Sequence, residues 1–238
     1  PACALLCGFA VVFALPPLEA GRHAIVARTP SDGFSADDAF HALIHVRDRV
    51  PVVCVGEESD LLFVRRALQP GSRDSGIEVR VVAPAFWDGT ALERAFAVLL
   101  VNAVPLPGPA LVDLERYLRS GGVVALFPGD RASPADYANL PWLPATPRSV
   151  EDIRPGQGRR TLRLRSPSDP LFEDLRLPPG VVPTLALRRW LRVGDPPSDA
   201  HVLIATDHDE PFLLARPFEA GRVLLFTVGA DRNWSSLP

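Results

Sequence analysis

Polar side chains follow three apolar runs in the middle of the chain, each at the point where a run ends. Glu57 comes directly after the first run, Asn102 ends the second, and Asp130 and Arg131 follow the third. The polar residues at these ends are Glu57, Glu58, Asp60, Asn102, Asp130 and Arg131. Open α/β sheets bind ligands at the carboxyl edge of their strands. We therefore expect these side chains to cap loops and helices, with a polar crevice lined by Glu57, Asn102, Asp130 and Arg131 as the alternative.

A second group of chemistry-bearing residues is the sequence Asp207-His208-Asp209-Glu210. Carboxylates and imidazole are ligands of hard or borderline metal ions. Consecutive residues of a hairpin turn point in divergent directions, however, so we expect a solvated turn and keep a metal site as the alternative. We predict neither a metal nor a cofactor for this chain.

The three cysteines are the candidate nucleophiles. Cys54 lies inside an apolar strand-like run, and Cys3 and Cys7 lie in the apolar N-terminal segment. Free cysteine commonly behaves as a small core residue. The sequence thus predicts three packed thiols, with a reactive Cys54 as the alternative. Their spacing matches no zinc pattern.

The elements that must position these residues begin with an uncharged run, Ala2–Leu15. It is short for a membrane span, which needs about 20 residues, so we expect a buried strand, with a truncated membrane or signal segment as the alternative. His23–Arg28 and His41–Asp48 alternate as strands do. Residues 1–48 are therefore predicted to be the last strands of a β-sandwich, and the start at Pro1 without Met indicates a fragment or a processed chain.

From Val50 onward, apolar runs alternate with helical patterns. The expected strands are Val50–Gly56, Ile77–Ala83, Phe96–Asn102 and Val123–Phe127. The expected helices are Ser59–Leu68 with Ser59 as N-cap, Thr90–Ala95, and Pro109–Ser120. This order predicts a parallel sheet with helices on both faces, as in flavodoxin-like α/β folds. Residues 49–238 would form this domain.

The C-terminal third looks β-rich. Strands are expected at Thr161–Arg165, Leu185–Val193, His201–Thr206, Phe212–Arg216 and Arg222–Thr227, the last three antiparallel. Arg148–Arg192 holds a surplus of Arg over acidic residues, which we interpret as a solvated polar face, with a partner-docking surface as the alternative. Asp231, Arg232 and Trp234 are expected to fix the tail by packing and hydrogen bonds.

Composition narrows the function classes. The chain has 238 residues, a formal charge of −3, and 47% hydrophobic against 22% charged residues. This is a globular composition that excludes wholesale disorder. The near balance of charge argues against a general nucleic-acid binder, which would carry a basic excess.

Several segments together resemble a known family. They are LPPLEAGRH, VRDRVPVVCVG, FVRRALQP, GGVVALFPGDR and GRVLLFTVGADRNWSSLP. In combination they resemble the carboxy-terminal half of bacterial BatA-like membrane proteins, in which a von Willebrand factor type A domain is followed by a β-sandwich and a class I glutamine amidotransferase-like domain. The resemblance implies membrane association through segments outside this sequence, an extracytoplasmic location, and a part in assemblies with MoxR-type ATPases.

The resemblance also says where a catalytic site should be. Glutamine amidotransferases place a Cys nucleophile on a tight strand-to-helix turn, where helix-terminal amides lower its pKa and stabilise an oxyanion. The corresponding segment here is Pro128-Gly129-Asp130-Arg131, and FTVGADRNW lacks a His paired with an acid. We therefore predict a non-catalytic interaction or scaffold module. The alternative is a hydrolase or small-molecule-binding domain that uses the polar crevice.

Overall fold

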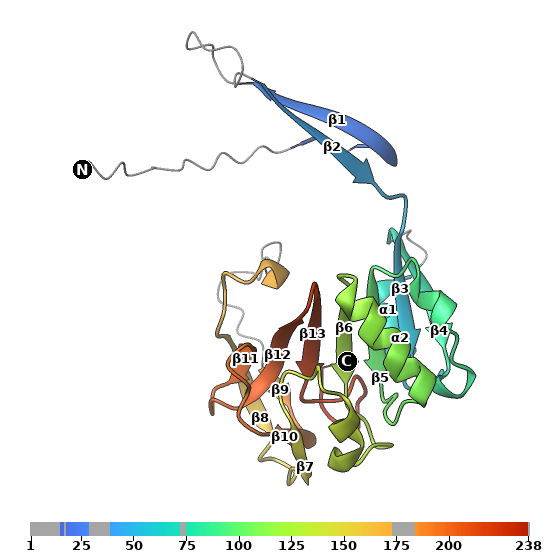
Figure 1. Ribbon diagram of the computed structural model, residues 1–238. Helices are drawn as coiled ribbons and strands as arrows, with labels where there is room; N and C mark the ends of the chain where they lie inside the picture. Colours follow the sequence, from blue (N-terminus) through green and yellow to red (C-terminus); the bar gives the residue numbers. More distant parts are fainter. Residues whose placement is uncertain (1–14, 17, 29–38, 72–74, 173–183, 238) are drawn as a thin grey trace, which may run out of the picture. The chain divides into compact units, whose positions relative to one another are not determined.

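The computed structural model describes residues 15–16, 18–28, 39–71, 75–172 and 184–237 (Figure 1). It divides into two compact units, Pro1–Arg49 and Val50–Pro238. The strand expected at Ala2–Leu15 lies outside the described residues except for its last one. Among the described residues, no helix is both long and apolar enough to cross a membrane.

The first unit contains a two-stranded antiparallel sheet. Strands β1 (Gly21–Arg28) and β2 (Ala39–Val46) pair from Gly21 opposite Val46 to Arg28 opposite Ala39. Half-exposed and exposed residues alternate along β1, as expected where one face of a sheet is partly covered. Phe40 and Leu43 on β2 remain exposed. The β-sandwich remains a prediction.

The second unit is built on a nine-stranded mixed sheet in the order β4-β3-β5-β6-β13-β12-β11-β8-β9 (Figure 1). Its parallel strands are β3 (Val50–Val55), β4 (Ile77–Val82), β5 (Ala97–Val101), β6 (Val123–Phe127) and β13 (Gly221–Phe226). Its antiparallel strands are β12 (Pro211–Phe218), β11 (His201–Thr206), β8 (Arg159–Leu164) and β9 (Thr184–Ala186). The expected parallel sheet with C-terminal antiparallel strands is therefore present.

One helix packs on each face of the parallel strands. Successive strand residues point to opposite faces, so each helix contacts its own set of strand side chains. Helix α2 (Gly108–Arg119) buries Leu114 and Leu118 in one core together with Val53 and Val55. The other core holds Cys54, from the opposite face of β3, and is next to helix α1 (Leu62–Leu68). Apolar runs buried on both faces are typical of parallel strands.

Two predicted helices differ from the structure. α1 begins at Leu62, so Ser59 is not its N-cap; residues 57–61 form a turn in which the Leu61 amide donates to the Glu57 carbonyl at 3.1 Å. The helix predicted at Thr90–Ala95 is a short 3₁₀ helix, η2 (Gly89–Leu92), in which the Thr90 amide donates to the Asp88 side chain. The other 3₁₀ segments are η1 (Pro84–Phe86), η3 (Pro134–Asn139) and η4 (Pro170–Phe172).

A separate antiparallel ribbon lies beside the large sheet. It pairs β7 (Pro147–Asp152) with β10 (Arg189–Val193). The sequence predicted one strand at Leu185–Val193, but the Arg188 and Arg189 amides donate to the Trp234 carbonyl and separate β9 from β10. The sequence pattern did not predict β7, because the residues of this strand are mostly polar and exposed.

Candidate functional site

The parallel strands reverse their order between β3 and β5. From β3 the chain moves outward to β4, then returns past β3 to β5 and continues to β6. At such a point neighbouring crossovers leave in opposite directions, and the crevice between the carboxyl ends of the two strands is the usual ligand site of open α/β sheets. Glu57 and Asp60 follow β3 and Asn102 follows β5, so these residues flank the reversal.

Asp60, Asn102 and Arg131 form a connected cluster at this edge, which we call the Asp60 cluster. The Asn102 amide donates to Asp60 Oδ2 at 3.2 Å, and Arg131 Nη2 donates to the same oxygen at 3.2 Å. Asn102 Oδ1 in turn accepts the Arg131 backbone amide at 3.1 Å. Glu57 completes the cluster, with Oε1 lying 3.4 Å from Arg131 Nη1.

A left-handed backbone conformation at Asn102 and close packing at two glycines allow the residues of this cluster to meet. Asn102 has a φ of 46°, a left-handed conformation that Asn adopts more readily than most residues. Its side chain passes so close to Gly129 that a Cβ at that position would lie 2.1 Å from Asn102 Cγ. A Cβ at Gly56 would lie 2.5 Å from the Val101 carbonyl oxygen. Two glycines therefore allow the ends of β3, β5 and β6 to approach one another.

Asp60 is the electrostatically perturbed member of the cluster. Burial raises the pKa of its carboxyl, and the neighbouring carboxylates of Asp231 and Glu57 raise it further. The Arg131 guanidinium and the Asn102 hydrogen bond oppose this shift without cancelling it. The result is a mostly covered carboxyl group, 16% exposed, beside an exposed guanidinium. Such a pair can accept from and donate to hydroxyl or amide groups of a ligand.

Asp130 does not join the Asp60 cluster, contrary to the expected geometry. Its Oδ1 accepts the Trp234 indole Nε1–H at 3.0 Å and an Arg189 Nη1 donor from β10. Of the four residues predicted to line the crevice, the structure brings together Glu57, Asn102 and Arg131. Asp130 instead links the end of β6 to the β7–β10 ribbon through Arg189 and to the C-terminal tail through Trp234. Ligand binding by these residues stays a prediction.

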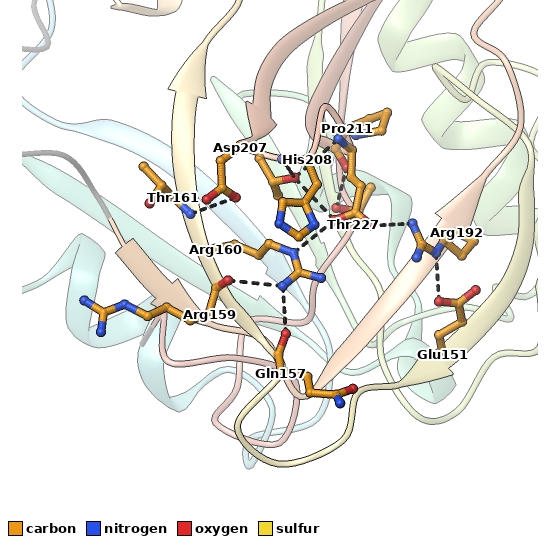
Figure 2. Close-up of polar contacts among 12 residues, drawn as sticks. Glu151, Gln157, Arg159, Arg160, Thr161, Arg192, Asp207, His208, Pro211 and Thr227 are labelled. Carbon is orange, nitrogen blue, oxygen red and sulfur yellow. Dashed lines mark hydrogen bonds and ion pairs between the residues drawn. The ribbon is translucent and has the colours of Figure 1, made fainter.

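A second charged cluster lies at the turn between β11 and β12, and we call it the Glu210 cluster. Glu210 accepts from Arg192 Nη1 at 2.7 Å and from Arg160 Nε at 3.2 Å. Figure 2 shows the two arginines approaching this turn from β8 and β10. Burial raises the Glu210 pKa, but the two guanidinium groups outweigh it and hold the pKa below its usual value. Arg160 and Arg192 were expected on a solvated face; the Arg160 side chain is only 12% exposed, so the expectation is wrong for it, whereas the Arg192 side chain is 39% exposed.

The remaining side chains of this turn point to separate partners. Asp207 accepts the Thr161 backbone amide at 3.2 Å (Figure 2), and Asp209 pairs with Arg165 at 3.3 Å. Within the part of the chain that the structure describes, no group of three or more His, Cys, Asp or Glu residues could hold a metal ion. No local pattern predicted the Glu210 cluster, because Arg160 and Arg192 are 50 and 18 positions from Glu210 and are brought to it only by the tertiary structure.

The thiol and the tail residues take structural positions. Cys54 is fully buried in β3, and burial raises its pKa to about 11. Asp231 Oδ1 accepts the backbone amides of Asn233 and Trp234 at 2.7 and 3.2 Å, and the Trp234 side chain is fully buried. The tail is therefore fixed by packing and hydrogen bonds, as expected.

Solved structures with the same fold are distant in sequence. A cytoplasmic protein of Salmonella typhimurium LT2 is 16% identical over 91% of this chain and 87% of that one, with a TM-score of 0.57. A putative ThuA-like protein of Bacteroides uniformis is 12% identical over 76% and 82%, with a TM-score of 0.55. A β-galactosidase of Bacillus circulans sp. alkalophilus is 13% identical over 79% of this chain and 30% of that one, with a TM-score of 0.50.

These similarities establish the fold alone. No family model matches the chain, and neither does any curated protein sequence. The ThuA-like neighbour, whose fold is amidotransferase-like, fits the flavodoxin-like α/β architecture predicted from the sequence.

Proposed function

We propose that the Val50–Pro238 unit is a non-catalytic interaction module with a class I glutamine amidotransferase-like fold. The observation that carries this proposal is the occupation of the carboxyl edge by the protein itself. Arg189 and Arg192 of β10 bind Asp130 and Glu210, and the Leu191 amide donates to the Thr227 carbonyl at 2.9 Å. Strand β10 thus covers the end of β13 and the start of β12, at the edge where ligands bind in related sheets.

The turn after β6 supports the same proposal. In an amidotransferase this turn presents a thiolate to the substrate. Here Asp130 stands in the turn and is held by Arg189 and Trp234. The Cys54 thiol is buried within the sheet, and its raised pKa of about 11 keeps it protonated at neutral pH.

We further propose that the chain belongs to a BatA-like, membrane-anchored assembly, with Pro1–Arg49 as part of the β-sandwich that precedes the α/β unit. Anchoring would use segments outside this sequence and place the domain outside the cytoplasm. A MoxR-type ATPase system is the proposed partner. This part of the proposal rests on the sequence resemblance described above.

A second candidate function is binding or hydrolysis of a small molecule at the Asp60 cluster. The observation that favours it is the position of the cluster at the reversal of strand order, together with the raised pKa of Asp60. A carboxyl group with a raised pKa beside a guanidinium is a common feature of catalytic sites, although structural ion pairs also produce it.

The decisive experiment measures turnover by the purified chain. We expect glutamine and p-nitrophenyl ester hydrolysis to stay at the rate without protein. Hydrolysis that is lost in Asp60→Asn but kept in the control Glu115→Gln, a surface carboxylate of α2, would overturn the non-catalytic proposal.

For the partner, surface plasmon resonance against a purified MoxR-type ATPase should give saturable binding, and a flat response up to high micromolar concentration would remove that partner.

A further inference from the structure

An apolar groove lies on the α1 face of the sheet. Its volume is about 310 Å³. Its floor contains Phe127 and Phe226 from β6 and β13, which are stacked with ring centroids 4.2 Å apart. Every lining side chain is apolar: Phe63, Val64, Ala67 and Leu68 of α1, Leu99, Phe127 and Phe226 of the sheet, and Ala230 and Leu237 of the tail.

The groove exists because this face of the sheet is only partly covered. On the α2 face the side chains of Val98, Leu100, Leu126 and Leu225 are fully buried. On the α1 face Leu99, Phe127 and Phe226, which alternate with them along the same strands, are only partly buried. Helix α1 has seven residues and borders the groove on one side. Parallel strands are normally buried on both faces, so this surface is suited to an apolar occupant.

An arginine side chain lies beside one of the aromatic residues that line the groove. The Arg232 guanidinium lies 5.3 Å from the centre of the Phe63 ring, in the geometry of a cation–π contact. Among the described residues Arg232 forms no ion pair, and the neighbouring Asp231 carboxylate is occupied by backbone amides of the tail. An exposed positive charge therefore lies next to Phe63, an aromatic residue of the groove lining.

We propose that this groove binds an amphipathic carboxylate, with its aliphatic body over Phe127 and Phe226 and its carboxylate at Arg232. A volume of about 310 Å³ holds roughly ten non-hydrogen atoms at ~30 Å³ each. An eight-carbon fatty acid has this size. The apolar lining excludes sugars and nucleotides, whose hydroxyl and phosphate groups would lose their water without gaining partners. This site goes beyond the proposed interaction role and does not depend on it.

The test is an NMR titration of the whole chain with octanoate, octan-1-ol and octylamine, which share one tail and differ in head-group charge. We expect saturable binding of octanoate, with shifts centred on α1, β6 and β13. Octylamine should bind at least about tenfold more weakly, because its cation meets Arg232. Ala67→Trp, at an exposed position of the lining, should abolish binding by filling the groove.

Arg232→Gln and Arg66→Gln form a matched pair, since both arginines are exposed and Arg232 is the one that lies over the ring of Phe63, a lining residue of the groove. Arg232→Gln should weaken octanoate binding about tenfold and leave octan-1-ol binding unchanged, whereas Arg66→Gln should alter neither. Equal binding of all three probes, or equal effects of the two variants, would overturn the assignment of Arg232. Absence of octanoate binding to the folded chain would overturn the site itself and leave the non-catalytic proposal standing.

Discussion

Gly129→Ala tests the packing that joins the ends of β5 and β6. A Cβ at Gly129 would lie 2.1 Å from Asn102 Cγ and Oδ1, which is far inside van der Waals contact. The Asn102 side chain would have to move away. It would then lose its hydrogen bonds to the Arg131 amide and to Asp60.

The expected cost follows from these contacts. Two hydrogen bonds of about 1 kcal/mol each, plus residual overpacking of about 1 kcal/mol or more, give a loss of about 2–4 kcal/mol in the free energy of unfolding. In an Asn102→Gly background the obstructing side chain is absent. There Gly129→Ala should cost less than about 1 kcal/mol, because Gly129 has no left-handed φ that would strain an alanine.

Equilibrium urea unfolding, followed by the fluorescence of the buried tryptophans, measures all four members of this double-mutant cycle. We expect a coupling free energy of at least about 1.5 kcal/mol between the two positions. If the two substitutions are additive within about 0.5 kcal/mol, Asn102 and Gly129 do not pack as described, and the geometry of the Asp60 cluster is refuted.

Three further predictions concern ionisable groups. Cys54 should resist alkylation by iodoacetamide at pH 8 in the native chain and react on unfolding, as measured by peptide mapping, because its pKa is raised to about 11. Glu210→Gln should lower the free energy of unfolding at pH 7 by about 2 kcal/mol, since Arg160 loses its carboxylate partner. The pKa of the Asp60 carboxyl is raised in the native chain. The wild-type chain therefore loses free energy of unfolding as pH rises through that pKa. Asp60→Asn removes this titration and should make the free energy of unfolding less dependent on pH.

Each of these three predictions has a result that would contradict it, and two of them also fix the direction in which stability changes with pH. Rapid native alkylation of Cys54 would show an accessible thiol. The Glu210 contribution should be present above the unfolded pKa of about 4.5 and disappear as pH falls through the lower native value. A Glu210→Gln effect that persists at pH 2 would therefore not be electrostatic. An Asp60→Asn chain that loses stability between pH 3 and 7 as steeply as wild type would show that Asp60 is not perturbed.

Local patterns predicted most of the regular elements. Val123–Phe127 and His201–Thr206 were predicted to the residue, because a continuous apolar run bounded by glycine or by a polar turn fixes a strand without reference to distant residues. The failures had tertiary causes. β7 carries few apolar residues and forms because β10 is available to pair with it. The helix α1 starts later than predicted because residues 57–61 form a turn, in which the Asp60 amide donates to the Glu57 carbonyl at 3.0 Å.

The sequence by itself determined that Glu57, Asn102 and Arg131 lie at one sheet edge, since the alternation of strands and helices predicts parallel strands, and parallel strands end at the same edge. Only the tertiary structure decided which of these side chains meet. Asp130 and Arg131 are adjacent in sequence, but neighbouring residues point in different directions, and one binds Arg189 and Trp234 while the other binds Asp60. The ion pairs at the carboxyl edge join residues up to 74 positions apart, and no local pattern encodes a contact across that distance.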